Sequence, residues 1–154
     1  MEQSPEYGKE FSYPNESQVC AVMELENGVV GNFALNGDSV LQDQAMFTVY
    51  GTKGILKLTD PNQFGGKNVY MPNSYDFASP AVWEEVDNTF AYEENSRGIG
   101  PSEMADAILS GRKNRANKEM AYHVLDVIDT MMKSSESGRF EEVASTCGRP
   151  EALE

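Results

Sequence analysis

The sequence is short of histidine, cysteine, basic residues and long apolar runs. Its one histidine, His123, and two distant cysteines, Cys20 and Cys147, give no set with zinc-ligand spacing, and we expect reduced thiols. The 12 basic residues are outnumbered by 25 acidic ones, and the net charge of -13 disfavours nucleic acid and anionic membranes as partners. No apolar run approaches the ~20 residues of a membrane span, and the N-terminus lacks a signal-peptide pattern. We therefore expect a cytoplasmic protein.

A phosphate-binding loop is also missing. The stretch RGIGPSEMADA at 97–107 has two glycines of a Gly-x-Gly-x-x-Gly pattern, but Glu103 stands at the third position, where a pyrophosphate would lie. The residues before it, FAYEENS, are acidic and polar, unlike the buried strand that leads into such a loop. We predict a helix start instead, with Gly100 as the N-cap, Pro101 at the first helical position and Glu103 in the first turn, where its charge complements the helix dipole.

The first half of the chain carries the pattern of antiparallel strands. Asn27-Gly28 favours a type I′ hairpin turn, since both residues tolerate positive φ. The expected strands are 18–25, 29–35, 44–50 and 55–58, with short edge strands at 68–71 and 82–86. Alternation along the first hairpin makes both faces apolar. Val19, Met23, Phe33 and Leu35 share one face, and Val22, Val30 and Ala34 lie on the other.

The last third is helical in its periodicity. We expect a helix from Pro101 to Ser110 ended by Gly111, and one from Lys118 to Ser137 between Asn117 and Gly138. Residues 140–146, FEEVAST, favour a short final strand. The apolar positions of the longer helix are expected to face inward: Met120, Ala121, Val124, Leu125, Ile128 and Met132. The fold class predicted is α+β, an open and mainly antiparallel sheet with helices on one face and the other available for dimerisation.

Few side chains have a pattern that points to chemistry. His123 lies among apolar helix positions, which favours a hydrogen-bonded packing histidine over an acid/base, and Glu119 and Asp126 have the spacing of surface pairs. The basic run GRKNR at 111–115 has two interpretations. It either complements a helix C-terminus, or contacts an anionic group of a cofactor or a neighbouring subunit.

Four stretches together resemble the C-terminal part of the glucose-fructose oxidoreductase / inositol dehydrogenase / rhizopine-catabolism (Gfo/Idh/MocA) family. They are YGTKGILKLTDPNQFGG (50–66), RGIGPSEMADAILSGRKNRAN (97–117), AYHVLDVIDTMMKSSESGR (121–139) and STCGRPEAL (145–153). The resemblance implies a substrate and oligomerisation domain at 17–154, with 1–16 as a leading segment and the start of the domain truncated. In this family an N-terminal Rossmann domain binds NAD or NADP, and the sheet of the second domain lines the substrate site and pairs subunits.

The family's catalytic elements are missing from this sequence. It has no glycine fingerprint, no Glu-Lys-Pro and no Asp-x-x-x-His helix, so we expect no catalytic or cofactor-binding residue and no activity from this chain alone. The resemblance implies a parent oxidoreductase or dehydrogenase that uses NAD(P) on a sugar, polyol or related small molecule. Arg97, Asn88 and Tyr92 are the residues expected toward the substrate. The alternative is a stand-alone, non-catalytic binding or assembly module that uses its open sheet face.

Overall fold

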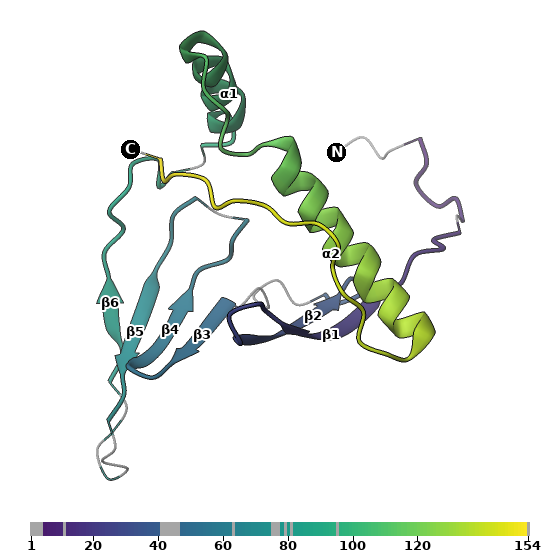
Figure 1. Cartoon of the computed structure of the whole chain (residues 1–154), viewed down its shortest axis with the longest axis horizontal. Coiled ribbons are helices and arrows are strands. Elements are labelled where there is room, and N and C mark those ends of the chain that lie inside the picture. Colours follow the sequence, from purple (N-terminus) through teal and green to yellow (C-terminus); the bar gives the residue numbers. More distant parts are fainter. Residues whose placement is uncertain are drawn as a thin grey trace. The chain divides into compact units, whose positions relative to one another are not determined.

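The computed structural model describes residues 5–10, 12–40, 47–62, 64–74, 78, 80, 82–94 and 96–153. The chain divides into two compact units, Met1–Gln42 and Asp43–Glu154. The described residues form two antiparallel sheets and two helices (Figure 1), which confirms the α+β class.

The first unit contains a hairpin of β1 (Gln18–Glu24) and β2 (Val30–Asn36). Its register pairs Val19 with Leu35 and Glu24 with Val30, which confirms the expected division of side chains between the two faces. The turn differs from the prediction. Gly28 has a φ of 80°, but Tyr92 is the one described residue other than glycine with positive φ, so Asn27 does not take the type I′ conformation. The Asn27 side chain instead accepts a hydrogen bond from the Val29 amide at 3.1 Å.

The second unit contains a four-stranded antiparallel meander. Its strands are β3 (Phe47–Gly51), β4 (Gly54–Leu58), β5 (Asn68–Pro72) and β6 (Glu84–Val86), paired in that order. Residues 44–46 of the expected third strand lie outside the described residues. Tyr70 covers the β3–β4 turn, where its hydroxyl donates to the Lys53 carbonyl at 2.7 Å. Gly54 is buried beneath the Tyr70 ring. A Cβ at this position would lie 2.5 Å from the ring, so a residue with a side chain would not fit.

Helix α1 (Ile99–Ser110) begins earlier than expected. Its N-cap is Gly98, with no side-chain cap, so the placement of Gly100 and Pro101 at the first positions was wrong. Pro101 is tolerated because the first turn of a helix leaves its amide groups without intrahelical partners. Gly111 ends the helix at a φ of 66°, as predicted.

Helix α2 (Lys118–Ser137) confirms both predicted caps. Asn117 accepts a hydrogen bond from the Met120 amide at 3.0 Å, and Gly138 ends the helix at a φ of 64°. The strand expected at 140–146 was wrong, because residues 139–153 form an extended tail without strand pairing. The tail, yellow in Figure 1, runs back along α2.

The tail changes which face of α2 is covered. Thr130 is buried, and His123, Asp126 and Ser134 on the same face are half-buried. Met120 and Met132 are half-buried as well, but the other apolar positions expected inward are exposed: Ala121, Val124, Leu125 and Ile128. That part of the prediction was wrong, because side-chain hydrogen bonds draw the tail onto the more polar face.

Candidate functional site

A chain of side-chain amides connects the loops at one end of the meander. The Thr59 amide donates to Asn68 Oδ1 at 3.1 Å, and Asn68 Nδ2 donates to Asn88 Oδ1 at 2.8 Å. Asn88 Nδ2 then donates to the Gly66 carbonyl at 3.1 Å. These bonds join the end of β4, the start of β5 and the segment after β6, so Asn88 is held from both ends of its amide.

A close backbone contact fixes the same loops. Gly65 is buried, and a Cβ at this position would lie 2.2 Å from the carbonyl oxygen of Glu93. Gly66 follows with a φ of 120°, a conformation that residues with a side chain rarely adopt. The Gly65-Gly66 pair therefore lets the loop after β4 lie directly against the segment that follows β6.

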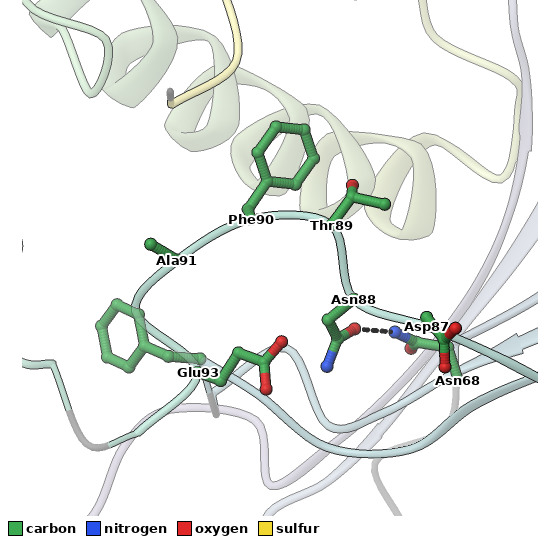
Figure 2. A pocket seen from close by; sticks show the side chains of 8 residues that line it. Asn68, Asp87, Asn88, Thr89, Phe90, Ala91 and Glu93 are labelled. Atoms are coloured by element: carbon green, nitrogen blue, oxygen red, sulfur yellow. Dashed lines mark hydrogen bonds between the residues drawn. The ribbon is translucent and has the colours of Figure 1, made fainter.

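A cavity of about 260 Å³ opens between these loops (Figure 2). The Glu93 carboxylate and the Asn88 amide point toward one another across it. Its wall includes two aromatic rings, two amides and two carboxylates, from Phe64, Phe90, Asn68, Asn88, Asp87 and Glu93. The volume lies just below the ~300–1,000 Å³ typical of small-molecule sites, and the mixture of apolar and polar groups is typical of them.

The three residues expected toward the substrate have different positions. Asn88 lines the cavity. Arg97 lies next to it: its guanidinium donates to the Asn62 carbonyl at 2.9 Å and to the Asn62 side chain at 3.1 Å. The same group lies 5.8 Å from the centre of the Phe64 ring. Tyr92 is exposed and has a φ of 74°, a rare conformation for a bulky residue.

Sequence reasoning missed most of the cavity wall. Asn68, Phe64 and Glu93 lie in segments interpreted as turn, short edge strand or loop. The available signal was the Gly65-Gly66 pair, because consecutive glycines in a loop often mark a close backbone approach.

A second polar cluster connects α1 to the loop that follows it. Glu103, whose side chain is 9% exposed, forms ion pairs with Arg112 and Arg115. The Arg115 amide also donates to the other Glu103 oxygen at 3.2 Å. The hydrogen bond from Arg112 is the largest cause that holds the pKa of Glu103 below its ordinary value of 4.5, and burial opposes it. Glu103 lies outside the first turn of α1, so its expected role at the helix dipole was wrong.

The basic run at 111–115 is engaged within the chain. Arg112 also pairs with Asp106 at 2.6 Å, and Lys113 pairs with Glu119 at 3.1 Å. Arg115 Nε donates to the carbonyls of Glu151 and Ala152, each at 3.1 Å. The run follows the end of α1, and its side chains tie that helix to the start of α2 and to the tail.

Comparison with known protein families decides the assignment. The family model described as "Oxidoreductase family, C-terminal alpha/beta domain", of the Gfo/Idh/MocA group, matches residues 1–144. The chain belongs to this family. No curated protein and no solved structure matches it in the corresponding comparisons.

In this Gfo/Idh/MocA C-terminal domain, His123 contacts the tail. Its Nδ1 lies 2.9 Å from the Ser145 hydroxyl, which confirms the prediction of a hydrogen-bonded packing histidine. Asp126 accepts a hydrogen bond from the Ser145 amide at 2.8 Å, and the bonds from the Ser145 hydroxyl and amide lower the pKa of Asp126. Because Asp126 bonds to Ser145 and not to the imidazole ring, the three residues lack the geometry of a catalytic triad.

The described part of the Gfo/Idh/MocA domain contains neither a metal-binding cluster nor a membrane-spanning helix. No group of three or more histidine, cysteine or acidic side chains there is arranged to hold a metal ion. Within the same residues, no helix is both long and apolar enough to cross a membrane. Cys20 and Cys147 are exposed free thiols.

Proposed function

We propose that this chain is the substrate-binding and oligomerisation domain of an NAD(P)-dependent oxidoreductase that acts on a sugar, a polyol or a related small molecule. The observation that carries the proposal is the cavity at the Asn68–Asn88 amide pair, in a chain that belongs to the oxidoreductase family. Amides, carboxylates and phenyl rings together suit a polyhydroxylated ligand. The polar groups bind hydroxyls, and the rings cover the apolar C–H surface.

Within such an enzyme the residues of this chain bind and orient the substrate. Among its contacts with the described residues, Asn88 keeps one amide hydrogen and one lone pair free, because the others bond to Gly66 and Asn68. Both groups are fixed before the ligand arrives, so little conformational entropy is lost when a hydroxyl binds them. We propose that an N-terminal Rossmann domain supplies the cofactor and the proton-transfer groups.

The residues of this chain do not fit a nicotinamide dinucleotide. The one Gly-x-Gly pattern leads into α1, and the third position of the fingerprint is occupied by Glu103, whose carboxylate pairs with Arg112 and Arg115. The third glycine of the fingerprint is therefore missing, and Pro101 within the pattern has no amide hydrogen to donate to a pyrophosphate.

The oligomerisation role is supported by the first hairpin. Val22 and Val30 on one face and Phe33 and Leu35 on the other each expose at least 40% of their surface. Contiguous apolar surface on both faces of a sheet is typical of an interface. A two-fold pairing of hairpins covers one face, and two-fold symmetry is the commonest in homo-oligomers.

An NMR titration of the chain tests the binding role. Neutral polyols, such as glucose and inositol, at millimolar concentration are expected to shift the side-chain amide signals of Asn68 and Asn88. Asn88→Ala should abolish the effect. Asn114→Ala is the matched control, because Asn114 lies between the two helices and outside this cavity.

The rival is a stand-alone binding or assembly module, which the apolar faces of the hairpin also favour. Self-association without any response to polyols would support the module and contradict the substrate domain. Binding of polyols that Asn88→Ala removes would support the substrate domain. The same titration with NAD and NADP is expected to give no saturable binding.

A further inference from the structure

The charge of the cavity wall narrows the class of ligand. Among the described residues that line the cavity, Asp87 and Glu93 are acidic and none is basic. In the described part of the chain neither carboxylate forms an ion pair. The wall therefore offers negatively charged acceptors without a cation to neutralise them.

The nearest basic side chains are engaged elsewhere. Lys67 pairs with Glu85 at 2.6 Å. Arg97 donates to Asn62 and lies 5.8 Å from the centre of the Phe64 ring, and it is not among the residues that line the cavity. The chain as a whole carries a charge of -13. An anionic ligand would therefore meet repulsion both from the wall and from the field of the protein.

The hydrogen-bonding groups of the wall also disfavour an anionic ligand, which is rich in acceptors. Asn68 and Asn88 each use one amide hydrogen within the network, which leaves two side-chain N–H groups for a ligand. The two carboxylates offer four oxygens. A ligand rich in donors matches this wall better than one rich in acceptors.

Building on the proposed function, we propose that the cavity selects a small cationic, donor-rich molecule of the aminosugar kind, with its ammonium group at the Glu93 carboxylate and with Asp87 adding to the negative charge of the wall. Glu93 points into the space opposite Asn88, so one ligand can meet the carboxylate and the amide together. The negative charge of Glu93 and Asp87 disfavours phosphorylated and carboxylated sugars. The volume of about 260 Å³ limits the ligand to about the size of a monosaccharide.

Calorimetric titration of the whole chain with four probes tests the proposal: glucose, glucosamine, glucuronate and glucose 6-phosphate. Glucosamine is expected to bind up to about fivefold more tightly than glucose, the upper limit for an exposed ion pair. The two anions should bind more weakly than glucose. Raising the ionic strength should lower the preference for glucosamine, because salt screens exposed charges.

Three variants test which residues cause the preference for glucosamine over glucose. Glu93→Gln and Asp87→Asn should each reduce the preference for glucosamine over glucose, while binding of glucose itself persists. Glu94→Gln removes the same charge one residue away, outside the cavity wall, and should leave the preference unchanged. Melting temperatures show whether each variant is folded, and the salt dependence of the unaltered chain tests the charge effect without any substitution.

The outcomes separate the two proposals. If glucuronate or glucose 6-phosphate binds as tightly as glucosamine, the charge preference is overturned, while the role in binding polyhydroxylated molecules stands. If glucose binds and glucosamine shows no preference that salt reduces, the inference about the carboxylates also falls. If none of the four sugars binds, both proposals are overturned.

Discussion

Glu103 in α1 accepts a hydrogen bond from the Arg115 guanidinium at 3.1 Å, across twelve residues of sequence. Arg115 at the same time donates to the Glu151 and Ala152 carbonyls. One carboxylate therefore orients the side chain that anchors the end of the tail. Replacement of Glu103 should affect α1, the loop after it and the tail together.

Glu103→Gln is expected to lower the melting temperature by a few degrees. Glutamine preserves the size of the side chain but removes the charge that pairs with Arg112 and Arg115. Thermal unfolding followed by circular dichroism measures the change. Glu136→Gln is the control, because Glu136 is an exposed residue of α2 that forms no ion pair within the described part of the chain. Equal melting temperatures for both variants would contradict a stabilising role for the cluster.

The same pair predicts the dependence of stability on pH. The folded state lowers the pKa of Glu103 from 4.5, with the Arg112 hydrogen bond as the largest cause. The stabilisation is therefore complete above pH 4.5 and is lost as the pH falls through the lowered value. Urea unfolding across this range should show a steeper acid loss for the unaltered chain than for Glu103→Gln. Parallel pH profiles would show that Glu103 does not contribute.

Asn117→Ala is expected to destabilise the chain by about 1 kcal/mol, since it removes the side chain that accepts from the Met120 amide. Chemical unfolding measures the difference. Asn117→Ser should retain most of the stability, because serine is also a good N-cap residue. If serine and alanine are equally destabilising, the loss arises from other contacts of Asn117, such as its bond to the Arg115 carbonyl.

His123→Gln should loosen the tail and lower the melting temperature without weakening the binding of polyols. The histidine contacts Ser145 and lies outside the cavity wall. Amide hydrogen exchange of residues 145–152 should accelerate. Ser145→Ala should have a similar effect, although the Ser145 amide can still donate to Asp126. A loss of polyol binding at an unchanged melting temperature would show that His123 serves the ligand site.

Light scattering at moderate salt is expected to show a dimer. Val22→Asp should shift the mass toward a monomer, because it places a charge on the exposed face that Val22 shares with Val30. Val40→Asp adds the same charge at an exposed residue outside the strands and should not change the mass. A monomer mass for the unaltered chain would remove the oligomerisation role from the proposal.

Local chemistry was sufficient to predict several features. Three helix ends lie where the sequence predicted them, at Asn117, Gly111 and Gly138, because capping depends on neighbouring residues. The faces of β1 and β2 followed from alternation alone. The predicted start of α1 was wrong because Gly98 and Gly100 are both compatible with a helix N-terminus. No capping side chain indicates which of the two glycines is the N-cap.

Contacts between residues far apart in sequence could not be predicted from local chemistry. The amphipathic pattern of α2 distinguishes two faces, but nothing in it shows that the tail covers the face of His123 and Asp126. Residues 140–146 have strand-like composition, yet side chains hold the tail. The cavity depends on the contact of Gly65 with Glu93 and on the Asn68–Asn88 bond, and each joins segments far apart in sequence.

The length that the tail can span, compared with the distance it has to cover along α2, differs on the two sides of Ser145. The Arg139 carbonyl is held by the Ser134 hydroxyl, and from there to Ser145 about six extended residues span at most about 20 Å. The stretch of α2 alongside, from Gly138 back to His123 and Asp126, rises by nearly the same length. Beyond Ser145, about seven residues can span roughly 23 Å, although α2 rises only about 8 to 12 Å from His123 and Asp126 back to its first residue, Lys118. A deletion before Ser145 would pull it from His123, whereas loss of a residue after it would be absorbed.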